Sequence, residues 1–144
     1  MSFHEKSNIA MLLLTGGVYT WYFASSAGVL LGGAASPELA LVVTNAKMLV
    51  TVGAIIIASI IAHIAIAIAA PSEANENADE RDKLVEMRGD QRGGYVMAVF
   101  ALMGMGAAMI AQPYYLIANL ILAGLVASEL VKGVSKLVDY RRGV

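Results

Sequence analysis

The sequence predicts an all-α membrane protein, in which four transmembrane helices run up, down, up and down in one bundle. Two observations lead to this prediction. The segment 51–70, TVGAIIIASIIAHIAIAIAA, carries no formal charge over a length that lets an α-helix cross a hydrocarbon core about 30 Å thick. Of the 144 residues, 58% are hydrophobic and only 15% are charged, whereas about a quarter are charged in soluble domains. Lipid is therefore the expected solvent of most of the chain.

Composition also argues against several classes of function. The chain has no cysteine, which removes disulfides, thiolate metal sites and cysteine nucleophiles. Its two histidines, His4 and His63, lie in different segments and provide no ligand set for a metal or a haem. The formal net charge is −1, so the chain lacks the basic field that nucleic acid would require. We expect no enzyme, no metal, no cofactor and no nucleic-acid partner.

Two apolar segments in the first half predict a helical hairpin, with helices at about 8–31 and 37–70. Ser36, Pro37 and Glu38 are typical of the start of the second helix. Serine caps free backbone N–H groups, proline fits the first helical turn, and a carboxylate suits the positive end of the helix dipole.

A charged connector is expected at 71–93. Within it we expect a short helix over 78–88, which Asn77 would cap. The glycines that follow this short helix predict a loosened backbone before the next membrane span, because glycine is a poor helix former; they are Gly89, Gly93 and Gly94.

The second half predicts another hairpin, with helices at about 94–111 and 114–138. Only Gln112 and Pro113 separate the two helices. A connection this short makes consecutive helices antiparallel neighbours.

The basic residues predict the orientation in the membrane. They gather at the N-terminus, in the connector and at the C-terminal end: Lys6, Arg81, Lys83, Arg88, Arg92, Lys132, Lys136, Arg141 and Arg142. The two opposite turns carry none. Since cytoplasmic loops are enriched in lysine and arginine, we expect both termini and the connector in the cytoplasm, with the chain in the inner (cytoplasmic) membrane. Lys47 is the exception and is expected at the outer headgroups.

Small residues spaced four apart recur on all four predicted helices, and such spacing favours close helix packing. The expected packing positions are Gly28, Gly32, Ala54, Ala58, Ala62, Gly104, Ala108, Ala123 and Ala127.

Polar side chains inside the predicted spans are the candidate site, because they are costly to bury in lipid. They are His63, Glu129, Asn119, Tyr19 and Tyr22. His63 and Glu129 lie at neighbouring depths and could form a titrating pair. Alternatively, His63 bonds a backbone carbonyl or a hydroxyl, and Glu129 pairs with Lys132 or Lys136. Asn119 is expected to hydrogen-bond another helix, and the tyrosines either fill space between helices or line a cavity.

Two stretches, DERDKLVEMRGDQRGGY (79–95) and LVDYRRG (137–143), resemble an uncharacterised family of small prokaryotic integral membrane proteins. Members of that family have four predicted helices, an acidic DER-type stretch before the third, and a C-terminal Tyr-Arg-Arg. The resemblance implies a bacterial or archaeal cytoplasmic membrane, and it transfers no functional residue because the family has no assigned activity. Small multidrug transporters also have four helices, but their membrane glutamate lies in the first helix, and this chain has no acidic residue between Asn8 and Leu31.

The stripes of small residues lead us to expect a protein that acts by helix–helix association. Its partners would be the lipid bilayer and either further copies of itself, as a homo-oligomer, or the other subunits of a membrane complex. The alternative is a small proton- or ion-coupled transporter or channel that uses His63 and Glu129.

Overall fold

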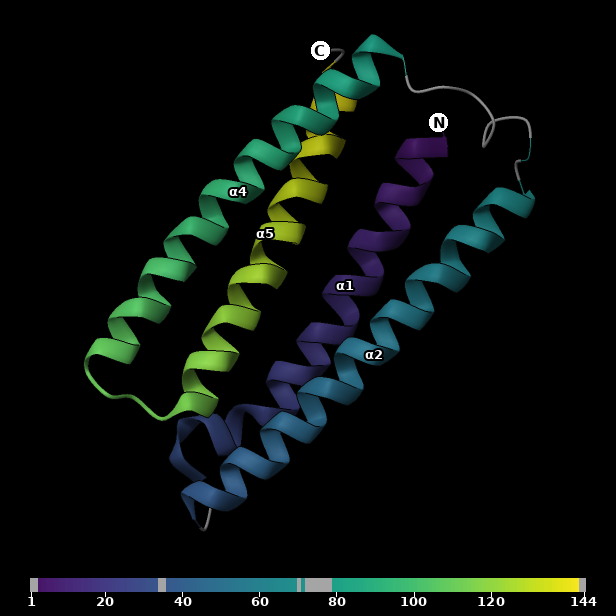
Figure 1. The fold of residues 1–144 in the computed structure, drawn as a ribbon. Coiled ribbons are helices and arrows are strands. Elements are labelled where there is room, and N and C mark those ends of the chain that lie inside the picture. Colours follow the sequence, from purple (N-terminus) through teal and green to yellow (C-terminus); the bar gives the residue numbers. More distant parts are fainter. Residues whose placement is uncertain (1–2, 34–35, 70, 72–78, 143–144) are drawn as a thin grey trace.

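A computed structural model describes residues 3–33, 36–69, 71 and 79–142, and these residues form an all-α fold without strands (Figure 1). The four long helices are α1 (Phe3–Gly28), α2 (Pro37–Ala69), α4 (Glu80–Met109) and α5 (Tyr114–Arg142). A short π-helical turn, η1 (Val29–Gly33), follows α1.

The first helix starts and ends earlier than the sequence predicts. It begins at Phe3 and gives way to η1 after Gly28, and within η1 Gly32 has a φ of +92°. Residues with a Cβ are strained in that left-handed conformation, whereas glycine adopts it readily. Gly32 therefore allows the chain to turn after α1. A Cβ built on Gly28 or Gly32 meets nothing within 4 Å in the described chain, so neither glycine packs against another helix of the same chain, and packing against a partner helix stays a prediction.

The start of α2 is confirmed. The backbone N–H of Leu39 donates to Ser36 Oγ at 3.2 Å, and that of Ala40 donates to the Ser36 carbonyl at 3.0 Å. Ser36 thus caps the helix, and Pro37 occupies its first position, as the sequence predicts.

The predicted break before the third span is wrong, because α4 is one continuous helix that starts within the predicted connector. Its N-cap is Asp79, whose carboxylate accepts from the Asp82 backbone N–H at 2.6 Å. The expected cap, Asn77, lies outside the described residues. Gly89 and Gly93 are both buried in the helix and do not interrupt it.

The short turn between α4 and α5 is confirmed. The Gln112 backbone N–H donates to the Ala107 carbonyl at 3.0 Å, and Ala111 takes a positive φ of 53°. Pro113 then precedes α5, which continues past the expected end at 138 to Arg142. The two helices are antiparallel neighbours along their full length (Figure 1).

The helices stand in the spatial order α4, α5, α1, α2 (Figure 1). Helix α5 packs extensively against α4 and also against α1, and α1 packs against α2. Helix α4 has extensive contacts with α5 alone. We call one end of this array the charged end; α1 and α4 begin there, α2 and α5 finish there, and it holds the basic residues of 81–92 and 132–142.

Apolar side chains lie on the outside and several polar ones lie inside, which is the reverse of their distribution in a soluble domain. Large apolar side chains are exposed on every helix, among them Leu13 at 70%, Val50 at 71% and Met109 at 85%. Polar Thr44 and Asn119 are buried at 1% and 4% exposure. Three helices, α2, α4 and α5, are long and apolar enough to cross a membrane. This exterior suits lipid, in which apolar surface costs nothing to expose.

Candidate functional site

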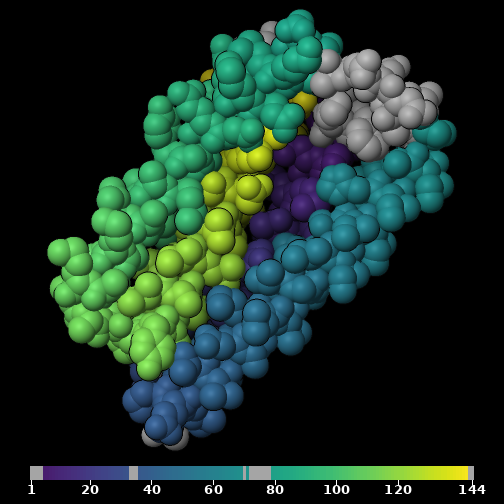
Figure 2. Space-filling model, viewed as in Figure 1, coloured from purple at the N-terminus to yellow at the C-terminus, as the bar shows by residue number. Residues whose placement is uncertain are grey.

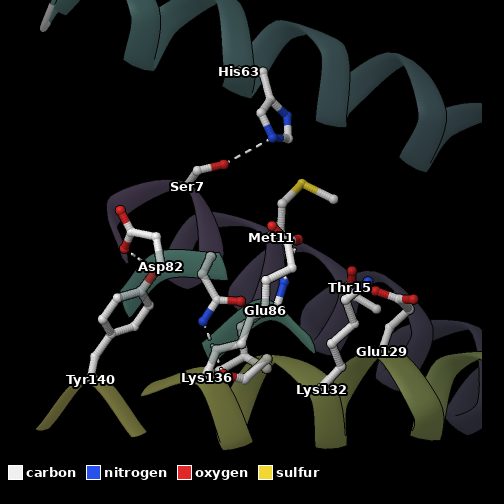
Figure 3. A pocket seen from close by; sticks show the side chains of 13 residues that line it. Ser7, Met11, Thr15, His63, Asp82, Glu86, Glu129, Lys132, Lys136 and Tyr140 are labelled. Carbon is white, nitrogen blue, oxygen red and sulfur yellow. Dashed lines mark hydrogen bonds and ion pairs between the residues drawn. The ribbon is translucent and has the colours of Figure 1, made fainter. Parts of the chain in front are cut away.

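A cavity of about 350 Å³ lies at the charged end, where all four helices contribute to its walls (Figure 3). Space-filling surfaces show a hollow between α2 and α5 in which α1 is visible (Figure 2). The polar residues that line the cavity are Ser7, Asn8 and Thr15 on α1, His63 on α2, Asp82 and Glu86 on α4, and Glu129, Lys132, Lys136 and Tyr140 on α5. His63 and Glu129, both predicted as site residues, therefore line one cavity.

The hydrogen bonds of His63 define its neutral tautomer. Its Nδ1 lies 2.8 Å from the Ser59 carbonyl, which can only accept, so Nδ1 carries the proton. Its Nε2 lies 2.9 Å from Ser7 Oγ, and in the neutral imidazole it accepts from that hydroxyl (Figure 3). The predicted alternative in which His63 bonds a carbonyl or a hydroxyl is confirmed, and the second bond links α2 to α1.

Glu129 is placed differently from both expectations. It is exposed to the cavity and, among the described residues, has no hydrogen bond or ion pair. The two lysines proposed as its partners bind carboxylates on α4 instead: Lys132 Nζ lies 2.7 Å from Asp90, and Lys136 Nζ lies 3.0 Å from Glu86. Glu129 acts on Lys132 only through its charge at longer range.

The lysine contacts belong to a regular ladder between α4 and α5. Acidic residues repeat every four positions on α4, and their partners repeat every four positions on α5, so they meet in antiparallel register. The rungs are Asp82 with Tyr140, Glu86 with Lys136, and Asp90 with Lys132. We call these six residues the ladder.

Two arginines add contacts around the ladder. Arg92 Nη1 donates to Asp139 Oδ2 at 2.9 Å, and the Asp139 side chain is only 5% exposed. Arg81 Nη2 donates to the Tyr140 carbonyl at 2.7 Å. The stretches 79–95 and 137–143, which carry the family resemblance, thus supply most of one interlocked structure. The signal in the sequence was the four-residue spacing of the acidic residues at 82, 86 and 90 and of the lysines at 132 and 136, and we did not predict their pairing from it.

The Tyr140 hydroxyl at the charged end has a strongly raised pKa. This hydroxyl donates to Asp82 Oδ1 at 2.8 Å. Burial raises the pKa of Tyr140 well above its ordinary value, and the hydrogen bond to Asp82 and the negative charges of Asp82, Glu86 and Asp79 raise it further. Tyr140 is therefore a neutral hydrogen-bond donor throughout the physiological pH range.

Glycines bring the helices close enough for these contacts, but they are mostly not the predicted ones. A Cβ on Gly89 would lie 2.9 Å from Lys136 Cγ, one on Gly93 3.0 Å from the Ser128 carbonyl oxygen, and one on Gly133 2.9 Å from Leu12. A Cβ on Gly124 would overlap Phe100.

The predicted packing positions on the later helices are placed as follows. A Cβ on Gly104 would lie 3.4 Å from Ile121, so Gly104 does face α5. Ala58, Ala62, Ala123 and Ala127 are half-buried, and Ala54 and Ala108 are exposed.

The remaining predicted site residues lie apart from the cavity. Tyr22 and Tyr19 are buried in the core cluster with Leu122 and Val126. The Tyr22 hydroxyl donates to Asn119 Oδ1 at 2.6 Å, which is the interhelical bond expected for Asn119. Asn119 Nδ2 in turn donates to the Tyr115 carbonyl at 2.7 Å. These tyrosines therefore fill the space between helices.

No family model, curated protein or solved structure matches this chain. The family resemblance of 79–95 and 137–143 stays a prediction.

Proposed function

We propose that this chain is a four-span integral membrane protein of the inner (cytoplasmic) membrane, with both termini and the connector in the cytoplasm, and that it belongs to the small prokaryotic family that it resembles. The charged end supports this proposal, since the basic residues on α4 and α5 and the start of α1 meet there. Lys47 lies away from that end, with its Nζ 5.3 Å from the centre of the Trp21 ring. Such a contact stabilises a cation that leaves bulk water.

We further propose that the protein moves protons, or a cation coupled to protons, through the cavity at the charged end. One observation carries this proposal: His63 and Glu129 line the same cavity, although they come from α2 and α5. Groups of this kind inside a membrane protein mark proton and ion pathways.

The chemistry of the two groups suits proton exchange. Neutral His63 holds a lone pair on Nε2 that Ser7 occupies as a donor, and rotation of that hydroxyl frees the lone pair for a proton. Glu129 lacks an ion-pair partner among the described residues, so its carboxylate can bind a proton or a cation without breaking a salt bridge.

Proton flux into vesicles tests this function. Purified protein would be reconstituted into liposomes that contain a pH-sensitive dye, and a potassium diffusion potential would drive proton entry. We expect entry faster than in empty liposomes, with most of the increase lost in Glu129→Gln and in His63→Asn. Glu38→Gln is the control, because Glu38 is an exposed carboxylate at the opposite end of α2. Flux equal to that of empty liposomes under both a pH gradient and a potential would refute the proposal.

The outer face of α4 favours association as a second function. Helix α4 packs extensively on α5 alone, and a Cβ on Gly94 or Gly106 meets nothing within 4 Å in the described chain. A second copy or another membrane subunit could approach this face closely. Light scattering in detergent would show an oligomer that Gly94→Leu and Gly106→Leu convert to monomers. A monomer that co-purifies with no membrane subunit would contradict it.

A further inference from the structure

We infer that the cavity is a binding site for a small organic ammonium ion, which the carboxylate of Glu129 and the hydroxyl of Thr15 hold. This inference rests on the cavity of the proposed function, but it concerns binding and not transport. It follows from the charges that remain free in the cavity, from one hydroxyl without a protein partner, and from the size and polarity of the space.

The free charge in the cavity is negative. Its walls carry the carboxylates of Asp82, Glu86 and Glu129 and the ammonium groups of Lys132 and Lys136. Both lysines are bound to carboxylates of α4. Asp82 accepts the Tyr140 hydroxyl, so within the described chain Glu129 alone is left without a short-range partner. A cation is therefore the ligand that the cavity can neutralise, whereas an anion would have to break an existing ion pair.

Thr15 supplies an independent sign of a missing partner. Its side chain lines the cavity and is only 8% exposed, yet it makes no hydrogen bond within the described residues. The Thr15 hydroxyl oxygen is therefore an acceptor that is open to the cavity and not occupied by a protein donor. A ligand N–H group in the cavity would donate to the Thr15 oxygen.

Size and polarity narrow the class of cation. A volume of about 350 Å³ is at the lower end of the range for small-molecule sites, so the ligand is small. Met11 and Leu12 form an apolar part of the wall, which suits a short hydrocarbon tail. A divalent metal is disfavoured, because no group of three or more metal-ligating side chains occurs among the described residues.

Two sources could supply this chemistry: a free primary amine from the aqueous phase, or the ethanolamine headgroup of a lipid. Both present an ammonium group with donor N–H bonds on a short carbon chain. The test therefore uses a soluble amine as probe and varies the lipid.

Isothermal titration calorimetry with butylammonium tests the inference on the full chain in nanodiscs of phosphatidylglycerol, which has no ammonium group. We expect saturable binding of butylammonium and none of butanoate. Glu129→Gln should weaken binding at least about tenfold, because it removes the one cavity carboxylate that has no short-range partner among the described residues. Thr15→Val should weaken it about threefold, because it removes one hydrogen-bond acceptor. Glu38→Gln, at the other end of α2, should bind like the wild type.

A gain of affinity provides a sharper test. Lys136→Met leaves Glu86 without its partner at the cavity wall, so butylammonium should bind more tightly by about threefold or more. A merely structural role of Lys136 would give equal or weaker binding. Unchanged affinity in Glu129→Gln, or equal binding of butanoate, would overturn the inference.

The lipid decides between the two sources. Discs of phosphatidylethanolamine that abolish butylammonium binding would identify the lipid headgroup as the occupant, and undiminished binding would identify the free amine. Binding without proton flux would refute transport and leave this site standing. Flux without butylammonium binding would refute the ammonium site and leave the proposed transport standing.

Discussion

The hydrogen bond between Tyr22 and Asn119 is buried at the interface of α1 and α5. Tyr22 is fully buried and its hydroxyl lies 2.6 Å from Asn119 Oδ1. Tyr22→Phe should lower the free energy of unfolding by about 1 kcal/mol, the usual worth of a hydrogen bond between membrane helices. Asn119 would keep its bond to the Tyr115 carbonyl, which limits the loss. Unfolding in a detergent mixture of increasing denaturing strength measures this change.

Tyr114→Phe is the matched control for that prediction. Tyr114 is 73% exposed at the start of α5, and its substitution should change the free energy of unfolding by less than about 0.5 kcal/mol. Equal losses in both variants would show that the Tyr22 hydrogen bond adds nothing specific.

The environment of Tyr140 predicts an unusual alkaline titration. Its pKa is raised by burial and by Asp82, so its neutral form is favoured in the folded state. The stabilisation is fully present below the ordinary pKa of tyrosine and is lost as the pH rises through the raised pKa of the folded state.

The difference between near-ultraviolet titrations of wild type and Tyr140→Phe reports this group alone. We expect its tyrosinate signal to appear only after the exposed tyrosines have ionised. The stabilities of the two proteins should converge at strongly alkaline pH. A difference signal at the ordinary pKa of tyrosine would contradict the hydrogen bond to Asp82.

At the scale of single residues, the sequence correctly predicted hydrogen-bond partners where an unpaired polar side chain within an apolar helix would cost free energy. A histidine or an asparagine within an apolar helix must find a carbonyl, a hydroxyl or an amide, and His63 and Asn119 do. The sequence failed for Glu129, because ion pairing depends on which carboxylate lies opposite each lysine. Asp90 and Glu86 are in that position, on a different helix.

At the scale of helices, adjacent glycines in α4 have opposite roles. A Cβ on Gly93 would lie 3.0 Å from the Ser128 carbonyl oxygen, whereas one on Gly94 meets nothing within 4 Å. Gly93→Ala should destabilise the protein by about 1–3 kcal/mol, because backbone would have to move and the bond from Ser128 Oγ to the Gly93 carbonyl would be strained.

Gly94→Ala provides the internal control at the neighbouring position. It should stabilise the protein by about 0.5–1 kcal/mol, since alanine is the better helix former and the added methyl group meets open space. Thermal unfolding in detergent, followed by circular dichroism, measures both variants. A Gly93→Ala variant as stable as Gly94→Ala would contradict the close approach of α4 and α5.

The same glycines explain the wrong prediction of a break in the third helix. Three glycines within 89–94 each cost roughly 1 kcal/mol in helix propensity. Close packing at Gly89 and Gly93 and the ladder between α4 and α5 offset that cost. Propensity is a local property of the chain, and contacts with α5, which come from about 40 residues further along, outweigh it.

At the scale of the whole molecule, the proposed topology predicts the accessibility of introduced cysteines. The chain has no cysteine of its own, so a single one can be labelled without background. A membrane-impermeant maleimide applied to intact cells should label Gln112→Cys and Glu38→Cys. Arg88→Cys and Arg141→Cys should react only after the cells are permeabilised, because they lie at the charged end.

Lys6→Cys decides whether α1 also spans the membrane. Helix α1 is not among the three described helices that are long and apolar enough to cross a membrane, so its span rests on the proposed topology. Protection of Lys6→Cys in intact cells is expected if α1 crosses. Labelling there, on the same side as Glu38→Cys, would refute the four-span topology.

The sequence by itself determined the all-α class, the start of α2, the short turn before α5 and the gathering of basic residues at one end. These features follow from properties that can be read along the chain without knowing how the helices pack: the length of the apolar segments, the capping residues and the positions of the charges. Only the tertiary structure decided which glycines form helix contacts, how α4 pairs with α5 in register, and that His63, Thr15 and Glu129 line one cavity. Each of these depends on the rotation and register of one helix against another. Successive residues are turned by about 100° around a helix, so a shift of one position points a side chain at a different neighbour.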